Sequence, residues 1–96
     1  ANTAHIMSWR QVCVTFHEGA KRLISGGHYA LYGPFAFAGA MEASNARFDA
    51  NLKGQNPAMG VRDLDELDPL AQMVGLALNR VIPMPANNHL LVWRKG

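Results

Sequence analysis

The sequence PFAFAGAMEASNARFDANL occupies residues 34–52 and has the pattern of one long helix. Its large apolar side chains recur at steps of three and four, which places them on one helical face. A series of small residues falls roughly opposite, where another backbone could approach closely. This small face consists of Ala36, Gly39, Ala40, Ala43, Ala46 and Ala50. A helix with two apolar faces is covered on both sides, so we expect residues 34–52 to form the central helix of the fold.

A helix is also predicted from about residue 9 to residue 25. Ser8 has the position of an N-cap, and Gln11 three residues later completes the pattern of a capping box. From Trp9 onward, apolar side chains fall on one half of a helical wheel and polar ones on the other. Residues 12–16 (VCVTF) have strong β propensity, but the cap and the long amphipathic pattern favour a helix.

A third helix is predicted over residues 69–82. Asp68 and Pro69 are typical of a helix start, because a carboxylate caps the first turn and proline suits the first helical position. Apolar residues then recur at helical spacing until Pro83 ends the pattern. Residues 28–33 (HYALYG) are interpreted as an aromatic connector between the first two helices.

Residues 89–94 (HLLVWR) are predicted to form a short strand near the C-terminus. Everything before them is interpreted as helix or loop, so this strand has no evident partner in the chain. Its pairing stays open between residues 5–7, a second copy of the chain and an edge of another protein. An extended tail packed on a helix is a further alternative.

The fold class predicted from these patterns is mainly α, a small three-helix domain around a central alanine-rich helix. A short C-terminal strand or extended tail completes it. Residues 1–96 are expected to form a single domain. Residues 1–7 are interpreted as a flexible lead or a remnant of an expression vector, since the first methionine is Met7.

Composition narrows the function classes. Charged residues make up 17% of the chain, below the roughly 25% usual for soluble domains, which favours self-association or a protein partner. The net charge of +2 is too small to argue for nucleic acid. No apolar run approaches the roughly 20 residues of a membrane span, and no signal peptide is visible. Cys13 is the single cysteine, which excludes an internal disulfide and favours a reducing, cytoplasmic location.

Motifs for metal or cofactor chemistry are incomplete. His17 and Glu18 begin the zinc-protease pattern, but Lys21 stands where the second histidine is required. The acidic residues between 63 and 68 would need an oxygen ligand at Leu67 and a glycine at Asp68 to form a calcium loop. We therefore predict no metal site and no cofactor, and interpret these acids as favouring a helix N-terminus.

The function favoured by the sequence is a small non-enzymatic protein–protein interaction module, homodimeric, acting as a regulator or inhibitor of a partner. The predicted interface consists of Ala36, Gly39, Ala40, Ala43, Leu91 and Trp93. The alternative is a ligand-binding domain or weak enzyme with a pocket near His17, His28, Tyr29 and Tyr32. A second alternative, a nucleic-acid-associated adaptor using Arg10, Lys21 and Arg22, is disfavoured by the sparse basic charge. No segment matches the motif set of a known family.

Overall fold

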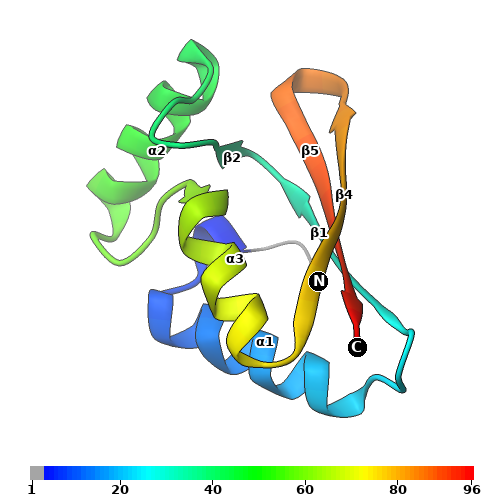
Figure 1. Ribbon diagram of the computed structural model, residues 1–96. Helices are drawn as coiled ribbons and strands as arrows, with labels where there is room; N and C mark the ends of the chain where they lie inside the picture. The colour runs from blue at the N-terminus through cyan, green and yellow to red at the C-terminus, as the bar shows by residue number, and fades with distance from the viewer. Residues whose placement is uncertain (1–3) are drawn as a thin grey trace.

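The computed structural model describes residues 4–96 and has an α/β architecture (Figure 1). Three strands form an antiparallel sheet in the order β1-β5-β4, and β2 and β3 form a short parallel pair. The prediction of a mainly α, three-helix domain is therefore wrong. The elements in chain order are a 3-10 turn η1 (Ala4–Ile6), α1 (Trp9–Arg22), β1 (His28–Gly33), β2 (Phe35–Ala36), α2 (Ala43–Gln55), β3 (Arg62–Asp63), α3 (Leu64–Met73), β4 (Leu76–Met84), a 3-10 turn η2 (Pro85–Asn87) and β5 (Asn88–Lys95).

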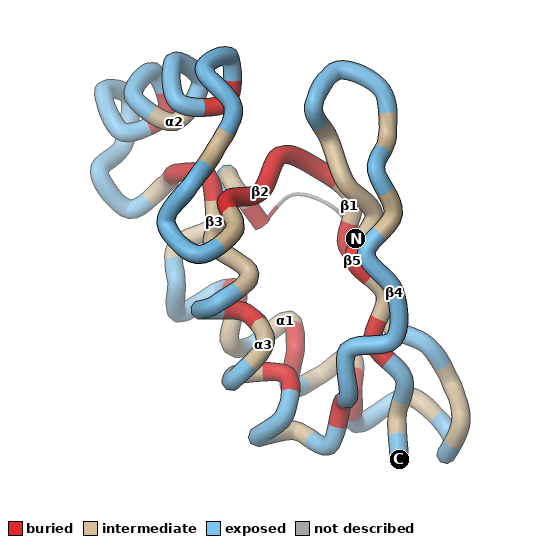
Figure 2. The backbone as a smooth tube through the Cα atoms, turned by 45° about the horizontal axis from the view of Figure 1, so that its top comes forward, coloured by how far each residue is buried: buried red, intermediate tan, exposed pale blue. Residues whose placement is uncertain are grey.

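The core lies between the sheet and the helices α1 and α3, which pack on the same face of it (Figures 1 and 2). Phe16 of α1, Leu67 of α3 and Trp93 of β5 are fully buried there. The rings of Phe16 and Trp93 meet edge to face, with centroids 5.2 Å apart. The Trp93 Nε1 donates a hydrogen bond to Asp68 Oδ1 at 3.1 Å, so the buried indole is also satisfied as a donor.

The prediction for α1 is confirmed at its start. Gln11 N donates to Ser8 Oγ at 3.2 Å, and Ser8 N donates to Gln11 Oε1 at 2.8 Å, which completes the capping box. The helix ends at Arg22 rather than at residue 25, because Leu23 adopts an extended backbone with ψ of 140°.

The predicted helix over residues 34–52 is wrong in its first half. Phe35 and Ala36 form β2, and the chain then turns through Ala38 and Gly39, whose φ angles of 52° and 81° a right-handed helix cannot contain. Asp63 explains the turn, because its carboxylate accepts from Ala38 N at 3.2 Å and from Gly39 N at 2.7 Å. A side chain distant in the sequence thus prevents the helix from starting before Ala43.

The predicted helix over residues 69–82 is also wrong. Helix α3 begins at Leu64 under an Asp63 cap, contains Pro69, and ends at Met73; β4 follows. A β-bulge between Leu78 and Arg80 shifts the register against β5, so Leu76, Leu78 and Val81 oppose Lys95, Trp93 and Leu91 on one face of the sheet. The bulge therefore spaces apolar residues by two and then three positions, which imitates a helical pattern in the sequence.

The predicted C-terminal strand is confirmed as β5, and its partners are in the chain. It occupies the centre of the sheet, paired with β1 from His28↔Arg94 to Gly33↔His89 and with β4 on its other side. Residues 28–33 are consequently a strand, and their interpretation as a connector is wrong.

The N-terminal lead predicted over residues 1–7 lies partly outside the described residues, since the description starts at residue 4. Within the described part, Ala4 is buried against the core and Met7 N donates to Ala4 O at 3.3 Å. None of the helices within residues 4–96 combines the length and the apolarity that a membrane crossing requires.

Candidate functional site

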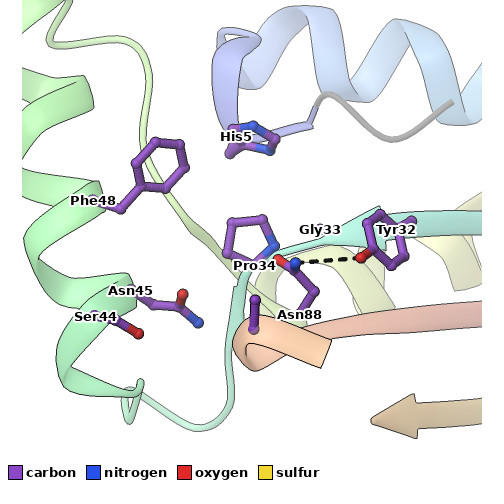
Figure 3. Close-up of a pocket in the computed structure, with 9 residues that line it drawn as sticks. His5, Tyr32, Gly33, Pro34, Ser44, Asn45, Phe48 and Asn88 are labelled. Carbon is purple, nitrogen blue, oxygen red and sulfur yellow. Dashed lines mark hydrogen bonds between the residues drawn. The ribbon is translucent and has the colours of Figure 1, made fainter. Parts of the chain in front are cut away.

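A cleft of about 460 Å³ lies where β1 ends, between α2 and the tip of the β4–β5 hairpin (Figure 3). We call it the strand-end cleft. Segments that are far apart in the sequence meet there. Its lining residues are His5, Tyr32, Gly33, Pro34, Ser44, Asn45, Phe48, Ala86 and Asn88. The cleft lies beyond the carboxyl end of β1 (Figure 3).

Asparagine side chains connect the two walls of the strand-end cleft. Asn45 of α2 exposes 6% of its surface, and its Nδ2 donates to the Asn87 carbonyl oxygen at 3.0 Å. Asn87 Nδ2 in return donates to Ser44 Oγ at 2.9 Å. Asn88 Nδ2 donates to the Tyr32 hydroxyl at 3.3 Å and to the Pro85 carbonyl oxygen at 3.2 Å. These bonds fix the orientation of the polar groups that face the cleft.

The hairpin tip, which carries Asn87 and Asn88, has a strained backbone. Ala86 and Asn87 have φ angles of 61° and 59°, both in the left-handed region. Asparagine tolerates this region, whereas alanine pays roughly 1–2 kcal/mol because its Cβ approaches the following carbonyl oxygen. Strain of this kind persists where the surroundings over-determine the backbone, and it concentrates at binding and catalytic sites.

One side of the strand-end cleft is formed by the rings of His5, Phe48 and Pro34 and carries no net charge. We call this side the apolar wall. The rings of His5 and Phe48 approach with centroids 5.6 Å apart, and Pro34 lies across from His5 (Figure 3). Burial lowers the pKa of His5 below its ordinary value of 6.5, so the imidazole is neutral at pH 7. Among the lining residues, all of which belong to the described chain, none is a lysine, arginine, aspartate or glutamate.

A second hollow of about 370 Å³ adjoins the strand-end cleft and shares Asn45 with it. Its wall includes Phe37 and His89, whose rings meet edge to face at 4.7 Å. The His89 Nδ1 is buried and has no hydrogen-bond partner within residues 4–96.

The structure does not gather the four ligand-binding residues predicted from the sequence. Tyr32 lines the strand-end cleft, whereas His28 is exposed at the opposite end of β1. Tyr29 points to the other face of β1 and packs on Phe16 at 4.9 Å. Burial raises the Tyr29 pKa, and its hydroxyl has no partner in the described part of the chain. His17 lines a separate hollow between α1 and α3.

The residues predicted as an interface are dispersed. Ala36 is buried in β2, Gly39 and Ala40 lie in an exposed turn, and Ala43 begins α2. Leu91 and Trp93 are fully buried inside the chain, in the core shared with α1 and α3. The small face of residues 34–52 therefore does not exist as one continuous surface.

A family model described as "Protein of unknown function (DUF938)" matches residues 1–95. The chain belongs to this family. Solved structures share the fold of this DUF938 member. TnmH matches with a TM-score of 0.78 and 22% identity over 99% of this chain and 29% of its own. An O-methyltransferase family protein from Burkholderia thailandensis matches with a TM-score of 0.81 and 14% identity over 99% of this chain and 28% of its own.

The SAH-bound form of CalO1, a methyltransferase in calicheamicin biosynthesis, matches with a TM-score of 0.79 and 16% identity. This match covers 96% of the DUF938 chain and 27% of CalO1. The chain thus spans less than a third of the length of these structures. At these identities the likeness establishes the fold alone, an α/β fold that the chain shares with a part of each of these structures.

The fold overturns the main functional prediction. A non-enzymatic, helical, homodimeric interaction module was inferred from a two-faced central helix and an unpaired strand. The helix does not extend over residues 34–52, the strand is paired inside the chain, and the fold is shared with methyltransferases. The alternative of a ligand-binding or enzymatic domain is the better supported one.

Sequence reasoning missed most of the strand-end cleft. From the sequence, His5 is placed in the N-terminal lead and Asn88 is assigned no binding role. Ser44 and Asn45 are adjacent polar residues inside an alanine-rich stretch, and Asn87 and Asn88 follow two closely spaced prolines. Paired polar residues in otherwise apolar segments were the available signal, but the sequence does not reveal that these two pairs meet.

Proposed function

We propose that this chain contributes the acceptor-binding part of a methyltransferase-like enzyme, with the strand-end cleft as the place where the small-molecule acceptor binds. The observation that carries the proposal is the position and lining of the cleft. It opens at the carboxyl end of β1 and presents amides and hydroxyls that are held in place by their own hydrogen bonds. Preorganised polar groups beside an apolar wall are typical of small-molecule sites.

The strand-end cleft does not fit the nucleoside that SAH and its methylated counterpart contain. Ribose hydroxyls are usually held by an acidic side chain, and no aspartate or glutamate lines this cleft within the described residues. We therefore assign the cleft to the acceptor and derive no step through the methyl donor. The chain's own contribution is to bind and orient the acceptor and to exclude water from it.

The test uses the natural protein that carries these 96 residues. Incubation with methyl-labelled S-adenosylmethionine and a panel of small neutral acceptors is expected to give label transfer to at least one of them. Asn45→Ala is expected to raise the KM for that acceptor by roughly tenfold, because a fixed polar contact is lost. Asn51→Ala is the matched control, since this asparagine lies on the exposed side of the same helix. A protein that neither binds SAH nor transfers label would refute the proposal.

A cytoplasmic location remains part of the proposal. It is supported by the low cysteine content of these 96 residues, in which Cys13 is the single cysteine, because disulfide-rich chains are typical of oxidising compartments.

A further inference from the structure

We infer that the strand-end cleft selects an uncharged aromatic ligand that carries a carbonyl acceptor beside an N–H or O–H donor, as an aryl carboxamide does. The inference rests on the proposed function only for the role of this ligand as acceptor substrate. The selectivity itself follows from the direction of hydrogen bonds in the cleft and from the absence of a countercharge among its lining residues in the described chain.

The amide of Asn45 presents a hydrogen-bond acceptor to the cleft. Its Nδ2 is committed to the Asn87 carbonyl oxygen, which fixes which end of the amide faces the hairpin. The oxygen then points the other way, toward the space between Phe48 and Pro34 (Figure 3). Asn45 exposes 6% of its surface, so a ligand that fills this space removes the oxygen from water. Such a ligand must supply a donor, because a buried acceptor left unpaired is costly.

The hydroxyl of Tyr32 presents a hydrogen-bond donor to the cleft. Asn88 Nδ2 donates to the hydroxyl oxygen, so the hydroxyl proton must be directed elsewhere. The second hydrogen of Asn88 Nδ2 is engaged by the Pro85 carbonyl oxygen. The nitrogen is therefore saturated, and the Tyr32 hydroxyl supplies a free donor on β1, while the Ser44 hydroxyl, whose oxygen accepts from Asn87 Nδ2, supplies another on α2. A ligand acceptor, such as a carbonyl oxygen, complements the Tyr32 hydroxyl.

The charge and shape of the cleft favour a neutral, planar ligand. The rings of His5, Phe48 and Pro34 form the apolar wall, which suits a planar ring. A carboxylate or phosphate would enter without a cationic side chain among the lining residues of the described chain. The lowered pKa of His5 is consistent with this, because a neutral imidazole supplies no countercharge at pH 7.

Three probes of nearly the same shape test this selectivity on the natural protein. Benzamide carries the ring, the acceptor and the donor; N,N-dimethylbenzamide lacks the donor; benzoate replaces the neutral amide with an anion. Protein-observed NMR titrations measure the three dissociation constants, and benzamide is expected to bind with a constant on the order of a millimolar. We expect N,N-dimethylbenzamide and benzoate each to bind roughly tenfold more weakly or worse. Equal binding of benzoate and benzamide, or no binding of benzamide, overturns the inference.

Tyr32→Phe tests whether the Tyr32 hydroxyl contributes to this selectivity. The variant removes one hydroxyl and is expected to weaken benzamide binding by about fivefold to tenfold. Tyr29→Phe is the matched control, because it removes a hydroxyl from the same strand but on the core side, and benzamide binding should not change. Equal effects of the two substitutions would show that the probe binds elsewhere, which also contradicts the inference.

A parallel titration with SAH separates this inference from the proposed function. If SAH binds and benzoate competes as well as benzamide, the methyltransferase proposal stands and the selectivity is wrong. If benzamide is preferred and SAH fails to bind, the selectivity stands and the proposed reaction is wrong.

Discussion

The two halves of this molecule are stabilised in different ways. The half built from α1, α3 and the sheet closes around Phe16, Leu67 and Trp93, which are fully buried (Figure 2). In α2 the buried residues are Asn45 and Leu52, one polar and one apolar, and most of that helix is exposed. Hydrophobic burial therefore holds the first half, whereas hydrogen bonds to Asn45, Ser44 and neighbouring groups position the second. The contrast separates the part that gives most of the stability from the helix that forms one side of the strand-end cleft.

The largest expected effect is on the packed half. Trp93→Ala removes a fully buried indole and the donor to Asp68 Oδ1, so the free energy of unfolding should fall by about 3–5 kcal/mol. Trp9→Ala is the control, since Trp9 is 37% exposed and should lose about 1 kcal/mol, mainly its contact with Arg62. Urea unfolding measures both. Similar losses for the two tryptophans would contradict the conclusion that the buried core around Trp93 supplies most of the stability of the packed half.

The next effect concerns the attachment of α2. Asp49 Oδ1 accepts a hydrogen bond from Val61 N at 2.8 Å, and Oδ2 pairs with Lys53 Nζ at 2.9 Å. Asp49→Ala should cost about 1–2 kcal/mol, because it leaves the Val61 amide unpaired. Asp49→Asn keeps an acceptor and loses the ion pair with Lys53, whose side chain is 57% exposed, so it should cost about 0.5 kcal/mol. Hydrogen exchange should show faster exchange in α2 for the alanine variant, with α1 unchanged; faster exchange throughout the chain would argue against a separately held α2.

A smaller effect of opposite sign is expected at the hairpin tip. Ala86→Gly removes the left-handed strain and should raise the free energy of unfolding by about 0.5 kcal/mol, after the entropic cost of glycine. Ala77→Gly is the control in β4, where the backbone is ordinary and glycine should destabilise the protein. Thermal unfolding of the two variants gives the comparison. A destabilised Ala86→Gly variant would mean that the tip is not strained.

The smallest effect is a pH dependence in the cleft. The folded chain lowers the pKa of His5 from 6.5 by desolvation, so the unfolded chain binds the proton more tightly. The stability tied to the neutral ring is then fully present above pH 6.5 and is lost as the pH falls through the folded pKa. His5→Gln should therefore reduce the loss of stability between roughly pH 7.5 and pH 5 in urea titrations. An undiminished loss in His5→Gln would assign it to other groups.

The sequence predicted part of the fold and little of the site. Tyr32 was the one predicted ligand-binding residue that lines the strand-end cleft. The cleft joins β1, α2, the hairpin tip and His5, and no local pattern reports that these segments meet. Hydrogen bonds between positions as distant as Ser44 and Asn87 decide its shape, and pairings of this range leave no periodicity in the sequence.

Local chemistry by itself determined α1 and β5. In α1, the capping hydrogen bonds of Ser8 and Gln11 and the amphipathic pattern are complete within a few helical turns. In β5, the apolar run around Leu91 and Trp93 favours an extended backbone, which pairs with neighbouring strands. The tertiary structure decided the rest. Strands β1 and β4 exist because β5 lies between them, since backbone groups of a strand are satisfied only by a neighbour. Ala38 and Gly39 leave the helical conformation because the Asp63 carboxylate accepts from their amides, and Phe35 and Ala36 leave it because they pair with β3. Local helix propensity was outweighed at each of these places by hydrogen bonds that form only once distant segments are brought together.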